Sequence, residues 1–289
     1  HLQQLTSGDM DFSVPVNSMP AATAEDAELA ALKLREDWNL GLDPISDLTD
    51  VLEDQRIHVI EVDAPERFDG ISGLASDSAG KPCAAAVVTR RGVPGDRQRL
   101  NLAHELGHLV LKPQQGADEE KLAFRFAGAF LAPAECLRKD VGGRRTAVRV
   151  DELLMMKARY KISLQAVLRR LVDLQIISQG YYKDSCIQIN KRGWRKREPA
   201  PIQPEQSRWL KKTTLRCLSE GLITSEKAEA LLGEKLDQHP LASLVQRSEF
   251  LKLPLEDRRR LLQQHAEQVA DQYRRDTSWK DIQEGDVLE

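Results

Sequence analysis

Apolar residues recur at helical spacing along most of the chain. In "TAEDAELAALKLREDW", Ala27, Ala31, Leu34 and Trp38 share one face, and Thr23 before them is suited to cap the helix. Pro44, Asp96 and Asp118 stand where three further helices are predicted to start. The segments with this spacing are 43–55, 96–112, 118–132, 151–178 as two helices, 207–235 as a second such pair, and 255–273.

Two short segments alternate instead, as half-buried strands do. They are "IHVIEVD" at 57–63 and "CAAAVVTRR" at 83–91. The stretch between them, "FDGISGLASDSAGKP" at 68–82, is rich in Gly and Ser and is predicted to be a loop. The pattern as a whole predicts an α+β fold that is mostly helical.

Length and composition describe a globular chain. It has 289 residues, of which 41% are hydrophobic and 30% charged. No apolar run approaches the roughly 20 residues that span a bilayer, and the start carries no secretory signal pattern. The four cysteines form no C-x-x-C pair, which favours free thiols over disulfides. We therefore expect a cytoplasmic protein without a membrane partner.

Charge is distributed unevenly along the chain. Residues 138–197 contain sixteen Lys or Arg and five Asp or Glu, although the whole chain has a net charge of −3. The run "KRGWRKR" places Trp194 among five basic residues, a pattern typical of nucleic-acid surfaces. A solvated helical face explains the same pattern equally well. The residues predicted to contact DNA are Arg169, Arg170, Arg192, Trp194 and Arg195.

The stretch "RQRLNLAHELGHLVLKP" contains candidate metal-binding and catalytic residues. His104 and His108 are four residues apart on a predicted helix, so both imidazoles can reach one ion. Glu105 lies beside them, where its carboxylate can take a proton from a water held by the metal. Gly107 costs stability inside a helix and suggests that another backbone approaches closely. The alternative is an ordinary amphipathic helix with His and Glu on its polar face.

A third ligand is available downstream. Asp118 is the better helix cap, which leaves Glu119 and Glu120. Glu120 shares a face with Ala123, a small residue that would let this helix approach Gly107. Glu119 lies about 100° away, toward solvent. We therefore predict that Glu120 is the third ligand, with Glu119 as the fallback, and the alternative is that these acids only favour the helix start.

The two-part motif resembles the core of the ImmA/IrrE metallopeptidase family. "QRLNLAHELGHLVL" matches its H-E-x-x-H helix, and "EKLAFRFAGAFLAP" matches its second helix pattern E-x-x-A-x-x-F-A ending in proline. The matching positions are Glu120, Ala123, Phe126, Ala127 and Pro133. The chain departs from the family at Phe124, where Asn is frequent, and near Ala129, where a polar residue is frequent. The resemblance extends over roughly residues 22–200.

This resemblance implies a minimal zincin-like peptidase domain that holds Zn²⁺ through His104, His108 and Glu120, with Glu105 as base and proton donor. Mn²⁺ is the alternative occupant of a site of this type. Tyr160 is the candidate for stabilising the oxyanion, with a packing role as its alternative. The implied substrate is a repressor-like or antitoxin-like protein. Many family members also carry an N-terminal helix-turn-helix DNA-binding domain, and the Met-less, linker-like start fits its removal.

The end of the chain, from "LPLEDRRRLL" onward, resembles the C-termini of antitoxins encoded beside PIN-domain toxins. An amphipathic helix followed by an acidic tail suits binding in a partner's groove, although a helix packed on its own domain is the alternative. The competing function is therefore a non-catalytic antitoxin or transcription regulator, which binds a toxin or DNA and has a structural or vestigial metal site.

The predicted organisation has five parts. In chain order they are a linker or expression remnant (1–20), the zincin-like metallopeptidase domain (21–136), a basic helix-turn-helix-like domain (137–200), a helical segment (201–240), and the amphipathic helix with the acidic tail (241–289).

Overall fold

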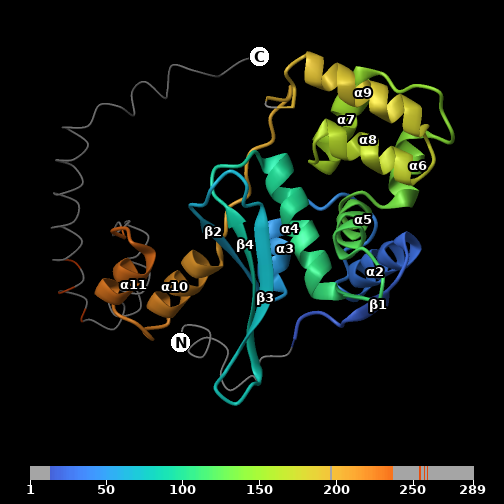
Figure 1. The fold of residues 1–289 in the computed structure, drawn as a ribbon. Coiled ribbons are helices and arrows are strands. Elements are labelled where there is room, and N and C mark those ends of the chain that lie inside the picture. Colours follow the sequence, from blue (N-terminus) through green and yellow to red (C-terminus); the bar gives the residue numbers. More distant parts are fainter. Residues whose placement is uncertain (1–13, 196, 237–253, 255–256, 258, 260–289) are drawn as a thin grey trace, which may run out of the picture. The chain divides into compact units, whose positions relative to one another are not determined.

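Helices account for most of the ordered elements, and the strands form two small sheets (Figure 1). The computed structural model describes residues 14–195, 197–236, 254, 257 and 259, which divide into two compact units after Thr224. The predicted α+β, mostly helical fold class is confirmed. The predicted helix at 255–273 and the acidic tail lie outside the described residues, apart from isolated positions.

The helices of the first unit are α2 (Ala24–Asp37), α3 (Leu48–Asp54), α4 (Gly95–Val110), α5 (Glu119–Leu131), α6 (Ala134–Val141), α7 (Val150–Tyr160), α8 (Leu164–Asp173), α9 (Gln179–Lys191) and α10 (Trp209–Ser219). The second unit contains α11 (Ser225–Leu232). Within the described residues, no helix is long and apolar enough to cross a membrane.

The larger sheet has three strands in the order β2-β4-β3. β2 (Ile57–Val62) runs parallel to β4 (Pro82–Arg90), and β3 (Gly70–Ser76) pairs antiparallel with β4. β1 (Met19–Ala21) and β5 (Leu111–Pro113) form a separate parallel pair. The prediction that residues 68–82 form a loop is wrong for Gly70–Ser76, because β4 supplies pairing partners for these residues despite the glycines and serines, with a register shift between Ala75 and Ser76.

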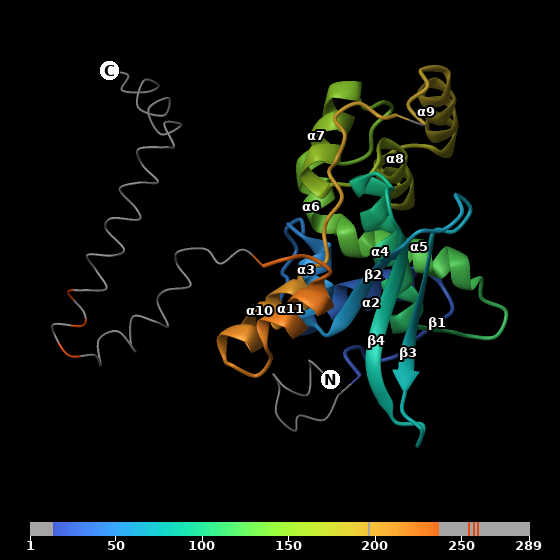
Figure 2. The ribbon, with the colours of Figure 1, turned by 90° about the vertical axis from the view of Figure 1, so that its left-hand side faces the viewer.

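α4 lies between the larger sheet and α5, and α2 covers the other side of α5 (Figures 1 and 2). Leu102, Leu106 and Val110 of α4 are fully buried in the core that these layers share. Gly107 makes the α4–α5 approach close, because a Cβ atom there would lie 3.2 Å from Ala123 Cα. The close backbone approach predicted from this glycine is confirmed.

Local sequence sets most of the helix starts. The Thr23 side chain accepts a hydrogen bond from Asp26 N, and the Asp26 carboxylate accepts one from Thr23 N, which is a capping box at α2. Asp118 caps α5 as predicted. Two predicted starts are wrong: Pro94 precedes α4 in place of Asp96, and α3 begins at Leu48 after Asp47.

Asp96 is used for a long-range contact instead. Its carboxylate is buried against the ammonium group of Lys157 on α7, which also pairs with Glu198 at 2.8 Å. The chain after α9 then returns to the start of α4, where Gly95 N donates to Ile202 O at 3.0 Å. These contacts join α7, α4 and the segment 198–208 into one unit.

The pair of helices predicted at 151–178 is confirmed as α7 and α8. Lys161 ends α7 in the left-handed conformation with φ of 53°, and the Ser163 hydroxyl accepts from Ala166 N to start α8. Their buried faces, including Leu153 and Leu168, join the same core as the sheet and α5.

Candidate metal centre

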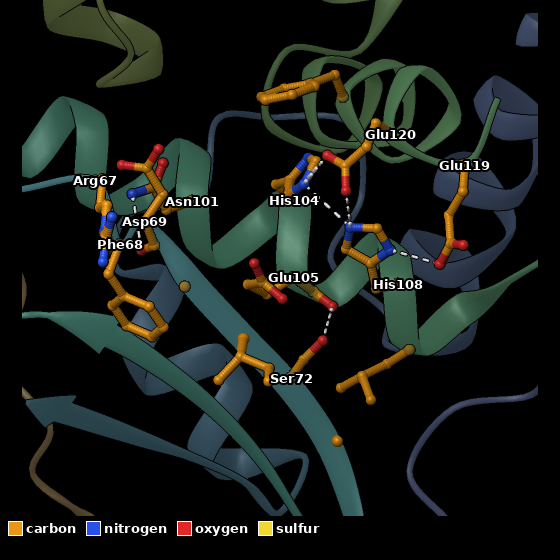
Figure 3. Close-up of a pocket in the computed structure, with 15 residues that line it drawn as sticks. Arg67, Phe68, Asp69, Ser72, Asn101, His104, Glu105, His108, Glu119 and Glu120 are labelled. Carbon is orange, nitrogen blue, oxygen red and sulfur yellow. Dashed lines mark hydrogen bonds and ion pairs between the residues drawn. The ribbon is translucent and has the colours of Figure 1, made fainter.

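A pocket of about 680 Å³ opens between α4, α5 and β3 (Figure 3). Its floor is the polar face of α4, and one wall is the edge strand β3 with the turn before it. The first turns of α5 form the opposite wall. The lining residues are Arg67, Phe68, Asp69, Gly70, Ile71, Ser72, Gly73, Asn101, His104, Glu105, His108, Leu109, Glu119, Glu120 and Phe124.

His104 and His108 turn their Nε2 atoms toward each other on successive turns of α4. The two atoms are 3.1 Å apart, and the ring centroids are 4.7 Å apart with the planes nearly perpendicular. His104 is buried, whereas His108 is partly open to the pocket. The helical spacing that the sequence predicts for these two residues therefore produces one point where both imidazoles converge.

Glu120 reaches the same point from α5 (Figure 3). Its Oε2 lies 3.2 Å from His104 Nε2, and its Oε1 lies 3.6 Å from His108 Nε2. Ligand atoms of His104, His108 and Glu120 all lie within 4.8 Å of one another. Among the described residues, this is the group whose geometry could hold a metal ion.

The chemistry of this donor set fits a divalent cation. Burial lowers the pKa of His104, and the neighbouring His108 lowers it further, so the imidazole is neutral near pH 7. Neutral imidazole is the form that binds metals. Two imidazole nitrogens and one carboxylate are a typical set for catalytic zinc, and the three residues line an open pocket.

Glu119 is exposed, as its position on the helix predicts, with 61% of its side chain accessible, but it also contacts a histidine. Its Oε1 lies 3.0 Å from His108 Nδ1, on the side of the ring away from Glu120 (Figure 3). It contacts the ring nitrogen that faces away from the candidate ion, so it is not placed as the third ligand.

Glu105 lines the pocket beside the two histidines and is 8% exposed. Burial raises the pKa of its carboxyl group above the ordinary value for Glu. Gly70 on β3 makes room for this side chain, because a Cβ atom there would lie 3.0 Å from both Glu105 Cγ and Oε1. The Ser72 hydroxyl donates to Glu105 O at 2.9 Å and so links β3 to α4 beside the Glu105 side chain.

Tyr160 is not in the pocket, which corrects its predicted role at the oxyanion. The residue is fully buried in the core, and its hydroxyl donates to Asp140 Oδ2 at 2.6 Å. Burial, followed by the contact with Asp140, raises the pKa of this phenol. The packing role that was its alternative describes the position.

The residues predicted to contact DNA fall into two groups. Arg170 is 1% exposed and donates to both carboxylate oxygens of Glu28 and to Ala132 O, so a phosphate cannot reach it and its prediction is wrong. Arg169, Arg192 and Arg195 are exposed. The Arg192 guanidinium lies 4.9 Å from the ring centroid of Trp194, which is half-buried.

Several pocket residues do not follow from the two-part motif. Asn101 precedes His104 by three residues and donates to Asp69 O at 3.1 Å. Asp69, Gly70 and Ser72 all come from "FDGISG", whose glycines signal a loop to sequence reasoning. Their position beside α4 depends on the pairing of β3 with β4, which connects residues that no local pattern relates.

Comparison with known proteins agrees with part of this description. Residues 87–172 match the family model of the IrrE N-terminal-like domain, a peptidase family. The match includes both histidines, Glu105 and Glu120, and supports the resemblance to the ImmA/IrrE family. Among curated proteins, none matches the chain. A solved structure of a Mycobacterium tuberculosis transcriptional regulator aligns at 16% identity with a TM-score of 0.37, and the alignment covers 51% of this chain and 46% of the other. The matched region therefore spans less than half of that protein.

Proposed function

We propose that this protein is a zinc-dependent endopeptidase that cleaves a regulatory protein. The observation that carries the proposal is the convergence of His104, His108 and Glu120 on one point beside the buried carboxylate of Glu105. The match of residues 87–172 to a peptidase family supports it.

His104 and His108 would hold the ion through Nε2, and Glu120 would hold it through its carboxylate. A zinc ion in a site of this type acts as a Lewis acid and makes water acidic enough to lose a proton near neutral pH. The donor set also accepts Mn²⁺, which remains the alternative cofactor.

Glu105 is the proposed general base. Its carboxylate would accept the proton of the attacking water and then donate that proton to the leaving amine nitrogen. The raised pKa of Glu105 suits both halves of this cycle, because a group that must accept and release a proton works best with a pKa nearer the working pH.

An extended substrate segment is the form that suits the pocket. β3 is the edge of its sheet, and among the described residues no strand pairs with its outer side. Unpaired N–H and C=O groups on such an edge can hydrogen-bond to an extended peptide. Residues 70–73 of β3 line the pocket beside His104 and Glu105, so a peptide on this edge would place its backbone near the candidate ion.

The experiment that tests this function uses a proteome-derived peptide library as substrate. The zinc-loaded wild type is expected to generate new N-termini, which are detected by labelling terminal amines and mass spectrometry. Glu105→Gln serves as the control because it keeps the three metal-binding side chains. Equal cleavage by the two proteins would contradict the role given to Glu105.

The proposed substrate is a regulatory protein of the repressor-like or antitoxin-like class. Binding to a PIN-type toxin depends on the C-terminal tail, which lies outside the described residues, so it stays a prediction. Location in the cytoplasm likewise stays a prediction.

DNA binding is a second candidate function, which the exposed Arg192 and Arg195 and the half-buried Trp194 favour. It predicts that affinity for duplex DNA falls steeply as salt concentration rises. The combined change of Arg192 and Arg195 to Ala is expected to weaken binding and to make the salt dependence shallower. Affinity that does not change with salt would rule out this surface.

A further inference from the structure

We propose that Glu119 is a positioning residue, which holds His108 in the tautomer and orientation that present Nε2 to the metal. The inference rests on the proposed metal site, but it concerns a side chain that contacts the ligand and not the ion. The sequence predicts Glu119 only as the fallback for the third ligand.

The hydrogen bond between Glu119 and His108 has a defined direction. Glu119 Oε1 and His108 Nδ1 are 3.0 Å apart. An ionised carboxylate can only accept a hydrogen bond, so the proton of a neutral His108 must lie on Nδ1. The Nε2 atom then carries the lone pair, and it faces His104 Nε2 at 3.1 Å and Glu120 Oε1 at 3.6 Å.

The two histidines differ in what holds their rings. His104 Nδ1 is buried and has no hydrogen-bond partner among the described residues. Its ring is held by packing instead, with the Phe124 ring centroid 4.1 Å away. His108 is more open to the pocket. Packing restrains His108 less, and the carboxylate of Glu119 is the contact that its Nδ1 makes on the side away from His104 and Glu120.

Both carboxylates come from the start of one helix. Glu119 and Glu120 are the first two residues of α5, directly after the cap Asp118. Asp118 Oδ1 accepts from Lys121 N at 3.1 Å and fixes the first turn. The first turn of α5 therefore carries both the third ligand, Glu120, and the residue that orients His108, Glu119. The two carboxylates lie on opposite sides of the His108 ring (Figure 3).

A different explanation is that Glu119 only stabilises α5, since a negative charge in the first turn interacts favourably with the helix dipole. Two substitutions separate the explanations. Glu119→Ala and Glu119→Gln both remove the charge, but Gln keeps an oxygen that can accept from His108 Nδ1. A helix-dipole role predicts equal effects, whereas a positioning role predicts that Gln retains more of the function.

The experiment measures the Kd for Zn²⁺ by competition with a chromophoric chelator. Glu119→Ala is expected to weaken binding by about 10–100-fold, the range typical for loss of a group that orients a metal-binding histidine, and Glu119→Gln by much less. Glu25→Ala is the matched control, because it removes an exposed first-turn acid from α2. Its affinity for Zn²⁺ is expected to equal that of the wild type.

A second readout observes the tautomer itself. In the metal-free wild type labelled with ¹⁵N, where no bound ion dictates the tautomer, His108 is expected to show a protonated Nδ1 in two-bond ¹H–¹⁵N spectra. The proposal would be overturned by a proton on Nε2 of His108. It would also be overturned by equal Kd values for wild type and Glu119→Ala, or by equal losses of affinity in the Ala and Gln variants. If the wild type binds Zn²⁺ but cleaves nothing, the peptidase function fails and the role of Glu119 stands. If the wild type binds no Zn²⁺, both fail.

Discussion

At the scale of single residues, the position of the Glu105 side chain depends on the absence of a side chain at Gly70. Gly70 faces it from β3, and an added Cβ atom would also lie 3.1 Å from Val88 O, so a side chain at this position has no free direction. The glycine is required here by space and not by an unusual backbone angle. A residue in the sheet therefore controls the position of the proposed base on α4.

Gly70→Ala is expected to displace the Glu105 carboxylate and to lower the cleavage rate by roughly tenfold or more, since small misplacements of a reacting group are costly. Zinc affinity should change little, because the atoms nearest to an added Cβ atom at position 70 belong to Glu105 and Val88 and not to the three ligands. Gly73→Ala on the same strand is the control, since nothing lies within 4 Å of an added Cβ atom there. Equal rates for the two variants, measured with one peptide substrate, would contradict this account.

Glu105→Gln is expected to abolish cleavage and to raise the melting temperature of the metal-free protein at neutral pH. The pKa of Glu105 in the folded state lies above its unfolded value, so folding disfavours the ionised form. The cost is absent below the unfolded pKa of about 4.3 and is complete above the folded pKa. The stability gained by the variant should therefore appear as pH rises from 4 to 8, and a gain that is constant over this range would be inconsistent with the raised pKa.

At the scale of elements, the site depends on how closely α4 and α5 approach. Gly107 contacts the backbone of Ala123, whereas Gly128 on α5 has only the flexible Arg170 Cδ within reach, at 3.5 Å. His104 and His108 come from α4, whereas Glu120 comes from α5. The distance between these helices therefore sets the distance between the ligands.

Gly107→Ala is expected to destabilise the fold by about 1–3 kcal/mol, because the helices must separate to admit the methyl group. It should also weaken binding of Zn²⁺. Gly128→Ala, in contrast, should leave stability unchanged or raise it by up to about 1 kcal/mol through better helix propensity. Urea unfolding of the two variants checks this, and a stabilised Gly107→Ala protein would contradict the close packing.

The sequence predicts elements whose signals are local and misses contacts between distant residues. Caps and apolar spacing predict α2, α5, α7 and α8, and the spacing of His104 and His108 predicts their convergence. Glu119, in contrast, contacts His108 only because α5 crosses α4 at Gly107. The pairing of β3 with β4 and the burial of Asp96 against Lys157 are also contacts between distant residues. Each depends on packing and produces no periodic pattern in the sequence.

At the scale of the whole molecule, the segment 198–208 belongs to the fold of the first unit. The carboxylate of Glu205 is buried against the Arg99 guanidinium, and it accepts from Leu48 N and Thr49 N at the start of α3, at 2.8 and 2.9 Å. The predicted domain boundary at residue 200 falls within these contacts. Neither composition nor helical spacing reveals the hydrogen bonds that the returning chain makes.

Glu205→Ala is expected to destabilise the first unit by about 3–5 kcal/mol, since it leaves the buried Arg99 charge without its partner. Glu220→Ala is the control, because its pair with Arg216 on α10 is exposed and contributes at most about 1 kcal/mol. Thermal unfolding followed by circular dichroism compares the two. Similar melting temperatures would show that the segment 198–208 is not part of the cooperative unit.

The central claim is that His104, His108 and Glu120 hold one zinc ion. The most direct test is the metal content of the purified protein, measured by inductively coupled plasma mass spectrometry after zinc has been supplied and excess removed. We expect about one zinc ion per chain for the wild type, loss of the ion in His104→Ala, and retention in His58→Ala. His58 lies on β2, outside the candidate site, and its ring contacts Trp209 of α10. A folded wild type without zinc, or equal zinc in wild type and His104→Ala, would contradict the claim.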